Sequence, residues 1–144
     1  MFTTVLIPLN IINSNNRIYT KEILEPHVNN FIGGTYGELD HSSDTLINLA
    51  NISHRIHNLR FTNKNLIGDI EILKTPKGKE LQWLLDSGVE MVFRPRSSGY
   101  SGDNNYVVLH KLITFDAIFL NDDSYFHTLQ EQRRRKLKIL SKIS

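Results

Sequence analysis

The apolar residues of this chain come in short runs, divided by clusters of turn-forming residues. The longest runs, such as 5–8 and 118–120, are far too short to span a bilayer, so no membrane partner is expected. Polar turn clusters stand at 13–16 (Asn-Ser-Asn-Asn) and 42–44 (Ser-Ser-Asp), and Asn and Ser favour turns because they bond to their own backbone. This pattern predicts a globular domain built from several short strands and helices.

The periodicity of each run predicts its type of element. Strands are expected at 3–12 (interrupted by Pro8), 47–61, 66–73, 89–93 and in two stretches of 106–120, and helices after Thr20, at 75–87 and at 124–144. Residues 94–99, which read Arg-Pro-Arg-Ser-Ser-Gly, are expected to form a loop. The resulting order, β–α–β–β–α–β–β–β–α, predicts an α+β domain whose mostly antiparallel β-sheet or barrel is flanked by helices.

Charge divides the chain into two parts. Residues 128–144 carry six lysines and arginines against one glutamate, a balance of +5, whereas residues 1–127 carry 11 bases and 14 acids, a balance of −3. We therefore predict a domain at 1–127 and a basic C-terminal helix or tail at 128–144. The basic segment could bind acidic scaffold protein or DNA, serve as a removable propeptide, or be a solvated tail. It suggests nucleic acid only weakly, because the domain itself is not basic.

Some site chemistries are excluded or disfavoured by composition. The chain has no cysteine, which excludes disulfides, thiolate metal sites and a cysteine nucleophile. A histidine-based zinc site is not expected either, because four of the six histidines show no ligand spacing: His27, His57, His110 and His127.

Residues 37–41, which read Gly-Glu-Leu-Asp-His, hold two acids beside a histidine. A carboxylate can fix the tautomer of a neighbouring imidazole, which then acts as a general base near neutral pH. His41 is therefore a candidate base, with Glu38 or Asp40 as the residue that orients it. The alternative is a loop with solvated acids, in which His41 only caps the turn.

Several motifs follow one another in a specific order. Residues 16–19 (Asn-Arg-Ile-Tyr) precede a helix, and the 37–41 run comes next; a hairpin leads to 72–78 (Ile-Leu-Lys-Thr-Pro-Lys-Gly) and a helix that ends at Gly88. The 94–99 run and 114–118 (Thr-Phe-Asp-Ala-Ile) complete the succession. Over roughly residues 4–126 it resembles the prohead core proteases of tailed bacteriophages, the T-even type in particular. That family is distantly similar to the herpesvirus assemblins in fold and in its serine/histidine mechanism.

The resemblance implies a serine endopeptidase that trims scaffold and major capsid proteins during phage head maturation. It would act in the host cytoplasm, within or on the prohead, with capsid and scaffold proteins as partners and with room for homo-oligomers. His41 would be the general base, oriented by Glu38, Asp40 or Asp116, among which the sequence does not choose. No cofactor is implied, since water performs deacylation.

The expected nucleophile is missing. Alignment on Gly88, Arg96 and Gly99 places the first serine of the family's Ser-Ser-Arg-Gly-x-Gly run on Arg94. Either Ser97 or Ser98 has taken over, a shift of about 10 Å along a strand, with Arg96 and nearby backbone N–H groups facing the oxyanion. Or the chain is a catalytically inactive pseudoprotease, in which Arg94 and Arg96 are structural or contact a partner. The residues alone slightly favour the pseudoprotease, whereas the family resemblance favours the shifted serine. The predicted function is therefore the protease, with the pseudoprotease as the alternative.

His54 lies in Ile-Ser-His-Arg-Ile at 52–56 and is a further candidate for the catalytic set. The arrangement would then be the Ser-His-His type of the assemblins. A lone histidine in an apolar strand is more often a hydrogen-bonded core residue, and we expect that role for His54.

Overall fold

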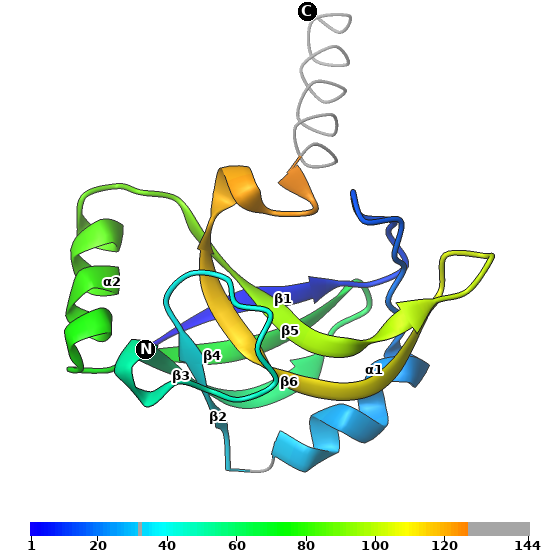
Figure 1. Ribbon diagram of the computed structural model, residues 1–144, viewed down its shortest axis with the longest axis horizontal. Coiled ribbons are helices and arrows are strands. Elements are labelled where there is room, and N and C mark those ends of the chain that lie inside the picture. Colours follow the sequence, from blue (N-terminus) through cyan, green and yellow to red (C-terminus); the bar gives the residue numbers. More distant parts are fainter. Residues whose placement is uncertain (32, 127–144) are drawn as a thin grey trace, which may run out of the picture.

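The computed structural model describes residues 1–31 and 33–126, with only the backbone of His110 (Figure 1). Within these described residues, six strands and two α-helices follow in the order β1, α1, β2, β3, β4, α2, β5, β6. Their bounds are β1 Phe2–Pro8, α1 Lys21–Val28, β2 Thr35–Glu38, β3 Ile52–Phe61, β4 Asn65–Ile72, α2 Pro76–Asp86, β5 Met91–Ser101 and β6 Val107–Phe119. Short 3₁₀ turns lie at Asn29–Phe31, Leu49–Asn51 and Leu120–Asp122.

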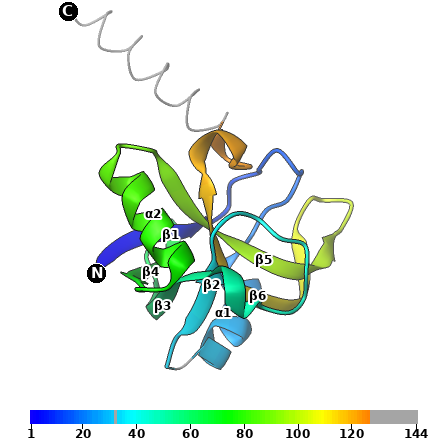
Figure 2. The same cartoon turned by 60° about the vertical axis from the view of Figure 1, so that its left-hand side comes forward.

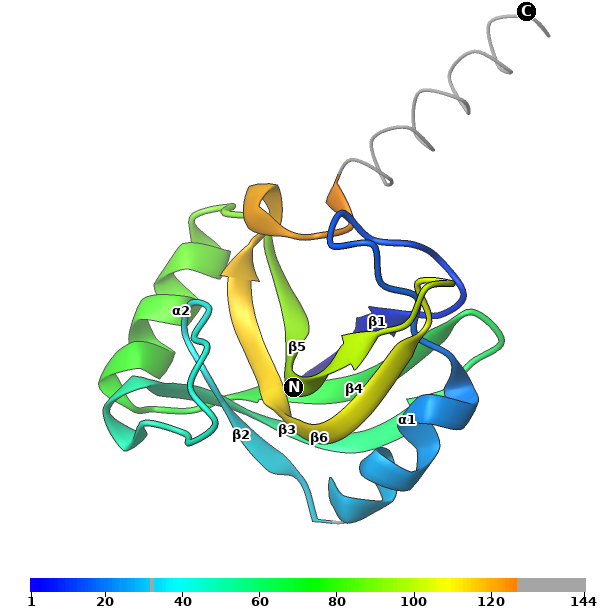
Figure 3. The same ribbon diagram turned by 45° about the vertical axis from the view of Figure 1, so that its right-hand side comes forward.

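The strands form two antiparallel sheets that curve around one interior. The first sheet has the order β1-β4-β3-β2, and the second is the β5–β6 hairpin. Where β2 ends, Leu39 pairs with Ala117 of β6 in a parallel bridge, and the Asp40 N–H donates to the Ala117 carbonyl at 2.7 Å. Figure 3 shows β6 bending across β2 toward α1. The α+β class and the mostly antiparallel sheet predicted from sequence are both confirmed.

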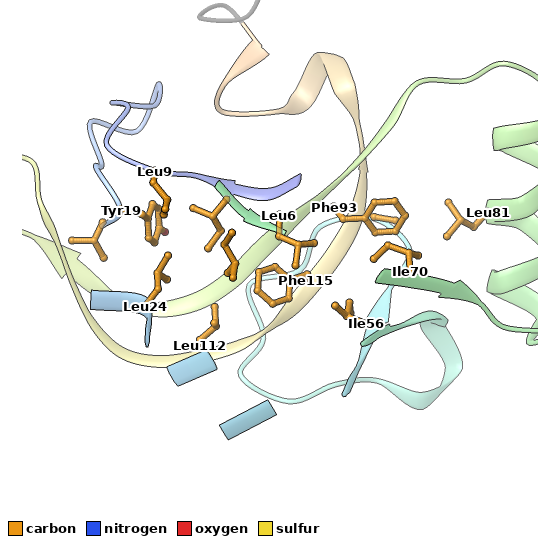
Figure 4. Close-up of a cluster of buried hydrophobic side chains, with 14 residues drawn as sticks. Leu6, Leu9, Tyr19, Leu24, Ile56, Ile70, Leu81, Phe93, Leu112 and Phe115 are labelled. Carbon is orange, nitrogen blue, oxygen red and sulfur yellow. The ribbon is translucent and has the colours of Figure 1, made fainter. Parts of the chain in front are cut away.

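The core fills the space between the two sheets (Figure 4). Phe93 of β5 and Phe115 of β6 are the largest of its fully buried side chains, and Leu6, Ile56 and Ile70 of the first sheet are also completely buried. Both sheets therefore contribute apolar side chains to one cluster, which stabilises their packing.

Both helices begin where their capping residues predict. The Thr20 hydroxyl accepts a hydrogen bond from the Ile23 N–H, and the Thr75 hydroxyl accepts one from the Gly78 N–H. Pro76 follows at the first position of α2, where a missing N–H has no cost. These local signals explain why the starts of both helices could be read from sequence.

Several element predictions were wrong. Residues 35–38 form strand β2, while the strand predicted from 47 begins only at Ile52, after a 3₁₀ turn capped by Asn48. Residues 94–99 are not a loop but the middle of β5, and 106–120 contains one long strand, β6. Strand β1 ends at Pro8. The basic segment predicted at 128–144 lies outside the described residues.

Candidate functional site

A cavity of about 440 Å³ lies beside the middle of β5 and the last residues of β6. Its lining comes from four segments that are distant in sequence: 13–19, 40–43, 94–97 and 118–125. His41, Arg94, Arg96 and Ser97, all singled out from sequence, line it together. Figure 2 shows the loop that follows β2 passing beside β5 and β6. His41 belongs to this loop and lines the cavity.

His41 is exposed at the cavity. Its backbone N–H donates to the Asp40 carboxylate at 2.8 Å, so that acid binds the backbone beside the ring. Asp40 itself has a positive φ of 74°, a conformation that Asp tolerates better than most residues. Among residues 1–31 and 33–126, no hydrogen bond to the His41 imidazole occurs. A carboxylate that orients the ring, as expected for a general base, is therefore not seen.

The two candidate serines lie in different surroundings. Ser97 is half-buried and lines the cavity with His41, whereas Ser98 does not line it. The β5–β6 register shifts after Arg96 and again after Ser98, so the strand is irregular on both sides of the pair. Of the two serines, only Ser97 shares a cavity with His41.

Arg96 binds both Glu38 and Asp116 in the interior. Its Nε and Nη2 atoms donate to the two Asp116 carboxylate oxygens at 2.8 and 2.7 Å, and Nη2 also donates to Glu38 Oε2 at 2.6 Å. All three side chains are at most 4% exposed. Burial works to raise the pKa of Glu38, but hydrogen bonds from Arg96 and the Asn48 N–H outweigh it and hold that pKa below its ordinary value.

This ion cluster corrects two sequence predictions. Glu38 and Asp116 were candidates to orient His41, but their carboxylates are bound to Arg96 instead. Arg96 was a candidate to face an oxyanion, but its two remaining N–H groups, on Nη1, donate to the carbonyls of Asp44 and Leu46 at 3.1 and 3.2 Å. Its five donors are thus all used within the protein.

Arg94 also turns inward. Its Nε and Nη2 donate to the two carboxylate oxygens of Asp123 at 2.9 and 3.1 Å, and Nη1 donates to the Val5 carbonyl of β1 at 3.0 Å. The guanidinium lies 5.6 Å from the centre of the Tyr125 ring. The side chains of Arg94 and Asp123 are 9% and 0% exposed. The guanidinium therefore links β1, β5 and the segment after β6.

His54 is a core residue, as expected. It is completely buried, with Nδ1 at 2.7 Å from the Ser53 hydroxyl and Nε2 at 2.8 Å from the Phe115 carbonyl. Because a carbonyl only accepts, Nε2 carries the proton and Nδ1 accepts from Ser53. Burial lowers the pKa of His54 to about 4, so the ring is neutral at pH 7. His54 does not line the cavity, so it does not join His41 there.

Comparison with known families shows which family the chain belongs to. The model of the prohead core protein serine protease family matches residues 2–117. The chain belongs to the prohead core serine protease family. A search of curated proteins found no match.

A solved structure agrees with this assignment. The bacteriophage T4 capsid assembly protease, gp21, superposes with a TM-score of 0.67, covering 82% of this chain and 80% of its own, at 19% sequence identity. At that identity the likeness concerns the fold. The family predicted from the order of the motifs is thus confirmed.

Two residues that contact Arg94 lie outside every motif recognised in the sequence. Asp123 and Tyr125 stand in a polar run at 121–125 that reads Asn-Asp-Asp-Ser-Tyr, and neither was singled out from sequence. Only the tertiary structure brings them to Arg94, 29 residues earlier in the chain. The available signal was Arg94 itself, which directly follows the mostly apolar run 89–93, since an arginine that becomes buried needs an acid.

Within the described residues, no group of three or more histidines and acids could hold a metal ion. No helix in that part of the chain is long and apolar enough to cross a membrane. The close pair His57 and Glu71, 2.7 Å apart, joins neighbouring strands β3 and β4 away from the cavity.

Proposed function

We propose that this chain serves phage head assembly as a pseudoprotease: a protein of the prohead core protease family that contacts capsid and scaffold proteins without cleaving them. The ion pair between Arg94 and Asp123 carries the proposal. The family's nucleophilic serine maps onto Arg94, whose guanidinium is bound by both oxygens of a buried carboxylate. A side chain so held is a structural element and has no nucleophilic atom to offer.

The surroundings of His41 support the same conclusion. Serine proteases of this kind need an imidazole that a third group holds in one tautomer. Here Glu38 and Asp116 are bound to Arg96, and Asp40 binds the His41 backbone. These three acids therefore serve other partners.

A second function, a serine endopeptidase with a shifted nucleophile, is favoured by one observation. Ser97 and His41 line the same cavity. In that case the Ser97 hydroxyl would attack the peptide carbonyl carbon while His41 took its proton and passed it to the leaving amine. Water would then hydrolyse the acyl ester, with His41 again as base.

Co-expression with the major capsid and scaffold proteins of the same phage tests both functions. Wild type, His41→Ala, Ser97→Ala and Ser98→Ala would each be expressed with these proteins, and the intact mass of every chain would be measured. We expect no trimming by any form, with the protein still recovered in assembled heads. Ser98→Ala is the matched control, because Ser98 does not line the cavity. Trimming that His41→Ala and Ser97→Ala abolish and Ser98→Ala keeps would establish the protease.

A further inference from the structure

The loop at residues 39–48 connects β2 to the 3₁₀ turn Leu49–Asn51 and carries His41 to the cavity. Most of its side chains are exposed, Leu46 by 78%, and it has no regular secondary structure beyond the bridge at Leu39. A loop with so little apolar burial has low local stability unless polar contacts hold it. Its position therefore depends on its hydrogen bonds.

Arg96 supplies two of these bonds from the interior. Its Nη1 atom donates to the carbonyls of Asp44 and Leu46, in the middle of the loop. Asp116 and Glu38 bind the other nitrogens of the same guanidinium, and these bonds restrict its rotation away from the loop. Because the contacts go to loop carbonyls, they depend on the path of the backbone and not on the loop side chains.

Glu38 makes a second connection to the same loop. The Oε2 atom that accepts from Arg96 also accepts from the Asn48 N–H at 3.2 Å. At the start of the loop, the Asp40 N–H donates to the Ala117 carbonyl at 2.7 Å. The loop is thus held near its start, its middle and its end, and the last two connections meet at one guanidinium.

We propose that Arg96 is a positioning residue that, with Glu38, fixes the 39–48 loop and so places His41 at the cavity. The role needs the planar guanidinium: it uses five donors, whereas a lysine in its place would offer three from a single nitrogen. The inference does not depend on whether the cavity cleaves or only binds a head protein.

Amide hydrogen exchange resolved by NMR tests this role. Arg96→Lys should raise the exchange rates of the Asp40 and Asn48 amides at least tenfold more than those of Ile56 and Ile70 in the core sheet. The matched control is Arg94→Lys, the same change at a buried arginine of the same strand, whose hydrogen bonds and ion pair in the described part of the chain go to residues outside the loop. Arg94→Lys should change the exchange rates of loop amides and core amides by similar factors.

A milder variant keeps the test valid if Arg96→Lys does not fold. Glu38→Gln retains the Arg96–Asp116 pair and removes the charge that helps hold the loop. It should speed exchange of the Asn48 amide at least threefold relative to Ile56. The inference fails if loop and core amides change by the same factor in both variants, or if Arg94→Lys opens the loop as far as Arg96→Lys does.

Discussion

Arg94 and Asp123 form a buried bidentate ion pair, with nitrogen–oxygen distances of 2.9 and 3.1 Å. Arg94 lies on β5, and Asp123 follows the 3₁₀ turn after β6. Since Arg94 also donates to the Val5 carbonyl, the pair holds the segment after β6 against β1 and β5. An internal link thus stands where the family resemblance calls for a nucleophile.

Removal of the Asp123 charge should destabilise the fold. Asp123→Asn leaves the buried Arg94 guanidinium without a counter-charge, and breaking one side of such a pair costs about 3 kcal/mol. Urea unfolding, monitored by circular dichroism, would measure this loss in the free energy of unfolding. The neighbouring Asp122 is exposed, so Asp122→Asn should change the free energy of unfolding by less than about 0.5 kcal/mol. Equal effects of the two substitutions would mean that the pair contributes little.

His54 should make stability depend on pH. Its folded pKa is about 4 against an ordinary 6.5, so between those values the unfolded state binds more protons. Its contribution is therefore complete above about pH 6.5 and is lost as pH falls toward 4, by about 3 kcal/mol in all. Urea unfolding from pH 7 to pH 4 should show this slope in wild type, and His54→Gln should flatten it. His27→Gln, outside the core, is the control. If wild type and His54→Gln share the same slope, the buried imidazole is not its source.

Gly37 should not tolerate a methyl group. A Cβ at this position of β2 would overlap His54 Nε2 and the Phe115 carbonyl, the two atoms of a buried hydrogen bond. Gly37→Ala should lower the free energy of unfolding by about 3 kcal/mol, as overpacking of a core does. Thermal and urea unfolding measure it, with Gly102→Ala as the control, because a Cβ there meets only the Asn104 side chain. A tolerated Gly37→Ala would show that β2 can move away from β6.

Local signals in the sequence predicted most of the elements. Thr75 and Pro76 define the start of α2 within two residues, so no distant contact is needed to read it. The 94–99 run misled the prediction, because its proline, serines and glycine favour a loop by composition. In the structure β6 pairs with it, and a partner strand overrides local preference.

The site was harder to predict than the fold. Glu38, Arg96 and Asp116 were all singled out, but their partners were not, because Glu38 lies 58 residues from Arg96 and 78 from Asp116. The 37–41 run looked like a set of acids around a histidine. In the structure Glu38 faces the interior while His41 faces solvent, since Glu38 ends β2 and the chain then turns.

We propose that this prohead-protease fold acts without a serine nucleophile, and infection by phage that carry single variants would test this. Head-protein processing and infectious titre would be measured for Ser97→Ala, His41→Ala and Asp123→Asn. We expect normal processing with Ser97→Ala and His41→Ala, and a reduced titre with Asp123→Asn, which weakens the fold. Unprocessed heads with both Ser97→Ala and His41→Ala, with each variant protein still present at the wild-type level, would show that the chain is a protease.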